Sequence, residues 1–197
     1  MKVIDPDYIM NLNTAGELGY KDVLYHPRFI DPNSDNNNST VKLFRRGCFN
    51  VLSLGDVESE NLSARLRRDK YLSREVDVLI LAHHGANNGF TNKKLLRRIQ
   101  PKVAICSSNY DNQFDHPRQE IRKLLYDEGV KLFTTKTGDI VVDSIGPNHD
   151  NFVITNLIKG STEVSSQTQI KAKKQGLLSM NMDTVKQLFT NRRKYPR

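Results

Sequence analysis

The fold is decided by residues 76–85, which read VDVLILAHHG. Such a mostly apolar run is typical of a strand that is buried on both faces of a sheet. Apolar residues at helical spacing follow it, with Leu95, Leu96 and Ile99 aligned and Pro101 ending the helix. A buried strand that leads directly into an amphipathic helix indicates an α/β protein.

The same alternation of strands and helices extends in both directions from this stretch. Upstream, Gly47 lies between two strand-like runs and supplies the backbone freedom that a hairpin turn needs. Helices are expected from about Ser59 and from Pro117, the second of which ends at Gly129. Strands are expected at residues 40–44, 49–54, 76–82, 102–107, 130–134, 139–142 and 151–158, with a turn at Gly138 joining the fifth to the sixth. The pattern predicts a mixed sheet with flanking helices.

Length and charge divide the chain into a body and a tail. The 197 residues are enough for one domain and an extension. The net charge of +8 is uneven, because residues 160–197 hold 8 Lys and Arg against 2 Asp and Glu. Residues 160–169 lack apolar periodicity, which predicts linker or disorder, and a short helix is expected at 182–189. We therefore predict an N-terminal segment at 1–39, a folded body at 40–159 and a basic, flexible tail at 160–197.

Apolar runs and cysteines indicate the compartment. The longest uninterrupted apolar run, residues 78–82, is too short to cross a bilayer, and the first residues lack the apolar stretch of a secretory signal. These features predict a soluble, cytoplasmic chain with no membrane contact. Cys48 and Cys106 lie in strand-like runs, which favours small buried thiols over a disulfide or a cysteine-rich zinc site.

Polar residues gather where three predicted strands end. Asp56 follows the first, His83 and His84 follow the second, and residues 109–116 follow the third. Strand–helix–strand crossovers make these strands parallel, so the three clusters should meet at the carboxyl edge of the sheet, where open α/β sheets bind ligands. Carboxylate oxygens and neutral imidazoles bind divalent metals. The sequence therefore predicts a site at this edge.

Each candidate also has a structural interpretation. Asp56 can be the cap of the following helix, and His116 can be a helix entry residue before Pro117. Successive side chains on a strand point to opposite faces of the sheet, so His83 and His84 should have different roles unless the backbone has already turned there. His26 and His149 have no partner in the pattern and are interpreted as surface or loop residues. The polar run at residues 35–40 is interpreted as a turn that leads into a strand.

Several motifs in register carry a family resemblance. They are NNS at 37–39, LGD at 54–56, DVLILAHHG at 77–85 and FDHP at 114–117. Together, over roughly residues 35–145, they resemble the metallo-β-lactamase-fold domain of ComEC-type DNA-internalisation proteins. The resemblance implies a four-layer αβ/βα sandwich with a metal site, usually dinuclear, between its two sheets. It also implies a hydrolase, with phosphodiesters as the substrate class.

The same resemblance implies roles for individual residues. Asp56 matches the aspartate that bridges the metals, and His84 matches the late histidine ligand. His83 would face the scissile phosphate and His116 would line the pocket, so the catalytic candidates are Asp56, His83 and His116. The cofactor would be a divalent metal, zinc or manganese, that activates water for attack and neutralises the developing oxyanion charge.

The first half of the family pattern is missing from this chain. The principal ligand motif HxHxDH is absent, because none of the 5 histidines forms an HxH pair. The resemblance therefore covers the second half of the sandwich only. Asp56 and one or two histidines fall short of the three protein ligands typical of a catalytic zinc. We expect weak metal binding, and little or no hydrolysis by this chain alone.

Half of a sandwich should also lack a covering layer. In the intact fold the sheet packs against a partner sheet, so an isolated half should expose an apolar face. We expect that face to drive self-association or to bind a complementary chain. Such a chain would be an upstream fragment that carries the missing motif, as in a split reading frame.

A non-enzymatic function in binding nucleic acid or a partner is the alternative. The basic tail can contact phosphates without reading sequence. Its cations are Lys171, Lys173, Lys174, Arg192, Arg193, Lys194 and Arg197, and Arg65, Arg67, Arg68, Lys93, Lys94, Arg97 and Arg98 are possible extensions. The structural interpretation of the same residues is solvated helix faces and a disordered end, because no known nucleic-acid-binding motif accompanies them.

Overall fold

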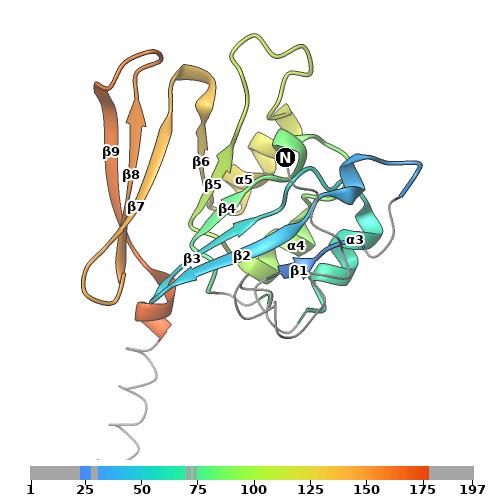
Figure 1. Ribbon diagram of the computed structural model, residues 1–197, viewed down its shortest axis with the longest axis horizontal. Helices are drawn as coiled ribbons and strands as arrows, with labels where there is room; N and C mark the ends of the chain where they lie inside the picture. Colours follow the sequence, from blue (N-terminus) through green and yellow to red (C-terminus); the bar gives the residue numbers. More distant parts are fainter. Residues whose placement is uncertain (1–22, 28–30, 70–71, 73–74, 178–197) are drawn as a thin grey trace, which may run out of the picture.

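Two sheets organise the molecule (Figure 1). The computed structural model describes residues 23–27, 31–69, 72 and 75–177. The larger sheet has 6 strands in sequential order, and the smaller has 3. The strands of the larger sheet are β1 (Val23–Tyr25), β2 (Val41–Arg46), β3 (Phe49–Ser53), β4 (Val78–Ile80), β5 (Val103–Cys106) and β6 (Lys131–Thr134). The predicted mixed sheet is confirmed.

The pairing across the larger sheet changes once, from antiparallel to parallel. β1, β2 and β3 pair antiparallel, and β2 and β3 form the predicted hairpin around Gly47. From β3 to β6 the pairing is parallel, in a register that aligns Val51, Val78 and Val103. The carboxyl ends of β3, β4 and β5 therefore lie side by side, as the sequence predicts.

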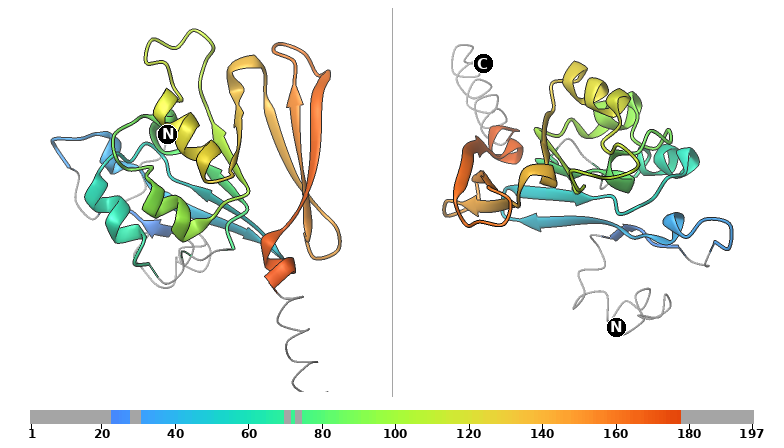
Figure 2. Two further views of the ribbon diagram at one scale, coloured as in Figure 1. Left: turned by 180° about the vertical axis from the view of Figure 1, so that it is seen from behind. Right: turned by 90° about the horizontal axis from the view of Figure 1, so that it is seen from above.

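Helices cover one face of this sheet (Figure 2). They are α3 (Glu60–Leu66), α4 (Lys93–Ile99) and α5 (Gln119–Asp127). Ser59 caps α3 by accepting a hydrogen bond from the Leu62 amide, as its short polar side chain favours. The apolar stripes of the helices pack on the sheet residues Leu52, Leu79 and Ala104. No helix in the described ranges has the length and apolar character that a bilayer span requires.

Pro117 is not the first residue of a helix. α5 begins at Gln119, with Arg118 as its N-cap residue, and Pro117 lies before the cap. The Arg118 amide donates a hydrogen bond to the carbonyl of Gly85, which holds Arg118 outside the helix at this end. The remaining predicted helices and the strands through residue 134 occur close to their expected positions.

The smaller sheet packs on the face opposite the helices. Its antiparallel strands are β7 (Ile140–Ile145), β8 (Asn151–Leu157) and β9 (Val164–Lys171). Phe152 and Ile154 of β8 pack against Phe49, Val78 and Val103 of the larger sheet. The two strands predicted on either side of Gly138 are present, and they belong to different sheets.

The prediction of linker or disorder at residues 160–169 is wrong. Val164–Lys171 forms β9, which pairs with β8 along its length. β9 is an edge strand whose side chains are mostly exposed, so its sequence carries no apolar periodicity, although its backbone is hydrogen-bonded. Beyond it, the Lys173 amide donates to Oδ1 of Asp77 at 2.7 Å, which ties the segment to the body. The helix predicted at 182–189 lies outside the described residues.

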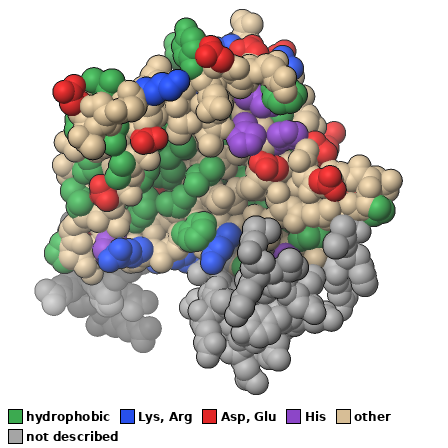
Figure 3. Space-filling view, turned by 45° about the horizontal axis from the view of Figure 1, so that its top comes forward, with side chains coloured by type: hydrophobic (Ala, Val, Ile, Leu, Met, Phe, Trp, Pro, Cys, Tyr) green, Lys and Arg blue, Asp and Glu red, His purple; other side chains and the backbone are tan. Residues whose placement is uncertain are grey.

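The second face of the larger sheet is only partly covered. Val78 and Val103 are fully buried under the smaller sheet. The next residues on this face, two positions nearer the carboxyl edge, are only partly buried. They are Ile80, Ile105 and Phe133. Figure 3 shows hydrophobic side chains on the same side of the molecule as the histidines. An open apolar face was expected, and the smaller sheet reduces its extent. Both cysteines are buried and unpaired, as predicted.

Candidate active site

The predicted site residues meet at the carboxyl edge of the larger sheet. Asp56 follows β3, the histidine pair His83 and His84 follows β4, and His116 lies in the segment between β5 and α5. The rings of His83 and His116 have centroids 5.8 Å apart, and those of His83 and His84 are 6.4 Å apart. The juxtaposition predicted from the parallel strands is therefore observed.

Asp56 and His84 form a close pair of possible metal ligands. Oδ1 of Asp56 lies 3.6 Å from Nε2 of His84, and both side chains are about half exposed. Nδ1 of His84 lies 2.6 Å from the carbonyl oxygen of Ser107, which only accepts hydrogen bonds, so Nδ1 carries the proton. In the neutral imidazole this leaves the lone pair on Nε2, the nitrogen nearest the carboxylate. A backbone carbonyl that orients a histidine in this way is a common arrangement beside metal ions.

A left-handed turn brings both histidines to this edge. The backbone of His83 has φ 44° and ψ 49°, and that of His84 has φ 54° and ψ 23°. Non-glycine residues rarely adopt this region, and such strained positions concentrate at functional sites. The extended backbone ends before His83, so the side chains of His83 and His84 need not point to opposite faces of the sheet. Gly85 continues the turn with φ 79°.

Glu58 is a site residue that the sequence analysis missed. Its Oε2 lies 3.4 Å from Nδ1 of His83, an ion-pair distance, and this buried nitrogen atom has no hydrogen-bond partner among the described residues. Hydrogen bonds from Ser34 and Asn36 hold the pKa of Glu58 below its usual value, and the charge of His83 adds to the effect. Glu58 therefore remains ionised and orients the His83 ring. The available signal was its position two residues after Asp56.

His116 is buried beside the other histidines. It is 8% exposed, and its Nδ1 has no hydrogen-bond partner in the described residues. Burial lowers the pKa of His116, and positive charge on His83 and Arg118 lowers it further. The Asn112 side chain fixes the His116 backbone, accepting from its amide at 2.6 Å and donating to its carbonyl at 3.1 Å. The His116 backbone is therefore held in place, and burial favours the neutral form of its ring.

The polar turn before β2 supports the loop that carries Asp56. Ser39 Oγ accepts a hydrogen bond from the Asp56 amide at 3.1 Å. Asn37 Oδ1 accepts from the amides of Glu58 and Ser59, each at 3.0 Å. The turn expected at residues 35–40, which contains the NNS motif, therefore also positions the carboxylates.

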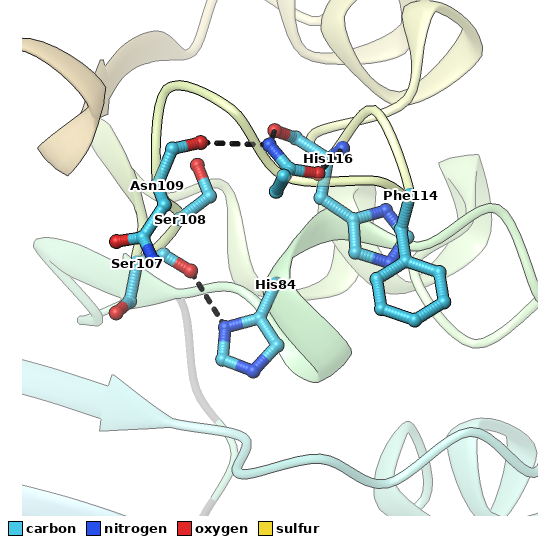
Figure 4. A pocket seen from close by; sticks show the side chains of 7 residues that line it. His84, Ser107, Ser108, Asn109, Phe114 and His116 are labelled. Carbon is cyan, nitrogen blue, oxygen red and sulfur yellow. Dashed lines mark hydrogen bonds between the residues drawn. The ribbon is translucent and has the colours of Figure 1, made fainter.

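A cavity of about 380 Å³ opens beside His84 and His116 (Figure 4). Ser107, Ser108, Asn109, Asn112 and Phe114 complete its lining. The Phe114 ring is stacked on His116, with centroids 5.7 Å apart and an interplanar angle of 19°. The cavity directly adjoins the candidate ligands.

The ligand set within the described ranges is incomplete. No group of three or more His, Cys, Asp and Glu side chains there is arranged to hold a metal ion. Asp56 and His84 offer one carboxylate oxygen and one imidazole nitrogen, which suit a borderline divalent metal. They would fit two positions of a metal site, and a catalytic zinc would need at least one ligand more.

Several cations proposed for nucleic-acid binding have structural roles. Lys173 Nζ donates to the carbonyls of Ile99 and Gln100 at the end of α4, where a cation is favoured. Arg97 and Lys93 pair with Glu128. Arg192, Arg193, Lys194 and Arg197 lie outside the described residues.

Fold and site together define an α/β protein with a histidine–carboxylate cluster at the carboxyl edge of its sheet. The chain is 31% identical over 121 residues to "ComE operon protein 3" of Bacillus subtilis (strain 168), covering 60% of this chain and 15% of that protein. It is 30% identical over 104 residues to "Competence protein ComA" of Neisseria gonorrhoeae, covering 51% and 14%. It is 32% identical over 100 residues to "Recombination protein 2" of Haemophilus influenzae (strain ATCC 51907 / DSM 11121 / KW20 / Rd), covering 51% and 12%. The similarity thus spans less than a sixth of the length of these curated relatives. No family model matches the chain.

Proposed function

We propose that the body of this chain is the second half of a metallo-β-lactamase-fold hydrolase that acts on phosphodiesters during DNA internalisation. The names of the relatives, which refer to competence and recombination, support a role with DNA. Helices on one face of the sheet, with the other face partly open, support a half of an αβ/βα sandwich. The order of the site residues along three neighbouring loops supports the family resemblance.

The observation that carries the proposal is the pairing of Asp56 with His84. Their side chains approach within 3.6 Å, and the bond from His84 to Ser107 leaves Nε2 available to a metal. Zinc or manganese bound by this pair would lower the pKa of water and offset negative charge on a phosphate. His83, oriented by Glu58, faces the phosphate, and neutral His116 can accept a proton at Nδ1.

The site needs further ligands from a segment outside the described residues. Two ligands are fewer than the three that hold a catalytic zinc. We propose that a segment carrying HxHxDH packs on the open apolar face, where Ile80, Ile105 and Phe133 are only partly buried. That position would bring its histidines next to Asp56. A complementary chain or a covalently linked segment would serve equally.

Metal titration tests this proposal. Calorimetry with zinc and manganese should give weak binding to the lone chain, lost in both Asp56→Ala and His84→Ala. His149→Ala is the matched control, because His149 bonds to Arg46 and Ser144 and to neither member of the pair. Turnover of bis-p-nitrophenyl phosphate should be near background alone and should rise when the HxHxDH segment is added.

Two results would contradict the proposal. Metal binding that survives both Asp56→Ala and His84→Ala would show that these two residues do not bind the metal. Tight stoichiometric binding with turnover by the lone chain would remove the need for a complementary segment.

A further inference from the structure

We infer that the cavity beside His84 and His116 binds an unpaired nucleobase stacked on Phe114, so that the site takes single-stranded rather than duplex DNA. This inference rests on the proposed function, because it names the form of the substrate at the same site. It is carried by the chemistry of the cavity lining.

The lining suits a neutral, planar group. The cavity has a volume of about 380 Å³, within the range of small-molecule sites. None of its lining residues is Lys, Arg, Asp or Glu, so the lining side chains give a phosphate no fixed countercharge in exchange for its hydration. Burial lowers the pKa of His116 and so favours its neutral form.

Phe114 offers a stacking surface. Its side chain is 55% exposed although it is large and apolar. The stacked His116 ring, which is itself buried, supports it. Bases stack on exposed aromatic rings of this kind in proteins that bind single strands.

Hydrogen-bonding groups surround the rest of the cavity. The side-chain amide of Asn109 makes no hydrogen bond within the part of the chain that the structure describes, and it offers both a donor and an acceptor. The Ser107 hydroxyl lies in the same lining. In a duplex the base edges are paired and the faces are stacked, so only an unpaired base can use these groups together with Phe114.

Cations next to the cavity can hold the backbone of the same strand. Arg118 is exposed and close enough to His116 to lower its pKa. Lys136 follows Thr135, whose hydroxyl bonds to the backbone of Ser108 in the cavity lining. Phosphates on either side of the bound base therefore have cationic partners outside the neutral cavity.

Oligonucleotide binding without metal tests the inference. Fluorescence anisotropy in EDTA compares a short labelled oligothymidylate, an abasic oligonucleotide of the same length and a duplex. Phe114→Ala should weaken binding of the oligothymidylate by about 10-fold or more, whereas Phe114→Tyr should keep it. Tyr126→Ala is the matched control, because Tyr126 is 84% exposed on α5 and lies outside the cavity lining.

The abasic strand should bind to the unaltered protein as weakly as the oligothymidylate binds to Phe114→Ala. Equal affinity for abasic and normal strands, equal affinity for duplex and single strand, or no binding of any strand would overturn the inference. Each of these results leaves the metal titration unaffected. Failure of the base cavity is thus distinguishable from failure of the hydrolase proposal.

Discussion

Gly85 lies so close to Pro117 that a Cβ atom on Gly85 would stand 2.7 Å from the Cβ of Pro117. The Arg118 amide also donates to the Gly85 carbonyl at 3.0 Å. This contact joins the turn that carries His83 and His84 to the segment that carries His116. The relative position of the three histidines therefore depends on residue 85 being a glycine, which has no side chain.

Gly85→Ala should destabilise the protein and weaken metal binding. The substitution adds a contact too short for a real Cβ atom at a residue whose φ is +79°. We expect a loss of about 2–4 kcal/mol in the free energy of unfolding, from left-handed strain together with overpacking. Gly129→Ala is the control, because Gly129 has φ +70° but nothing within 4 Å. Equal losses in urea unfolding would show that the contact with Pro117 contributes nothing.

Asp77→Ala should be among the most destabilising substitutions in the body. Asp77 is fully buried, and its carboxylate accepts from the amides of Asn50 at 3.0 Å and Lys173 at 2.7 Å. Alanine leaves both amides without an acceptor, which should cost about 2–5 kcal/mol. Asp143→Ala, at an exposed position of β7, should change stability by less than about 0.5 kcal/mol. Similar losses for the two variants in urea unfolding would contradict the assigned role.

His116 should make stability depend on pH below about 6.5. Its folded-state pKa is lowered, so the unfolded chain binds the proton more readily between the folded and unfolded values. Stability should therefore be complete above the unfolded pKa and decline as the pH falls through this window. His116→Gln should flatten the decline in urea unfolding at a series of pH values, while His26→Gln should not. If the loss of stability at low pH were unchanged in His116→Gln, other groups would be responsible for it.

Asn37→Ala should loosen the loop that carries Asp56. The side chain accepts hydrogen bonds from two backbone amides of that loop. We expect a loss of about 1–3 kcal/mol and weaker zinc binding than in the unaltered protein. Asn33→Ala is the control, because its side chain is exposed and makes no hydrogen bond in the described ranges. Unchanged zinc affinity in Asn37→Ala would mean that the loop keeps its position without Asn37.

Deletion of residues 178–197 separates the two ways of binding nucleic acid. The segment holds Lys186, Arg192, Arg193, Lys194 and Arg197. Its removal should reduce the salt dependence of oligonucleotide binding but leave the effect of Phe114→Ala intact. Complete loss of binding in the 1–177 chain would favour the basic tail as the binding element. A deletion at residue 159 would instead remove β9 and the amide partner of Asp77.

The convergence of Asp56 with the histidines could be predicted, because parallel strands place their carboxyl ends at one edge. The turn at His83 and His84 could not, since a left-handed backbone at two non-glycine residues depends on tertiary contacts such as that of Gly85 with Pro117. β9 was missed because an edge strand is specified by backbone pairing rather than by buried side chains. Glu58 was missed because its partners, Ser34 and Asn36, are distant in sequence.

The hydrogen bond between Lys173 and Asp77 has a practical consequence for handling the protein. Asp77 precedes β4 and the histidines follow it, so the described chain leaves the body at the rim opposite the candidate ligands. An affinity handle attached after residue 177 would therefore anchor the molecule to a sensor surface with its histidines turned toward the solution. Immobilised protein in this orientation is suited to measuring metal and oligonucleotide association without obstruction.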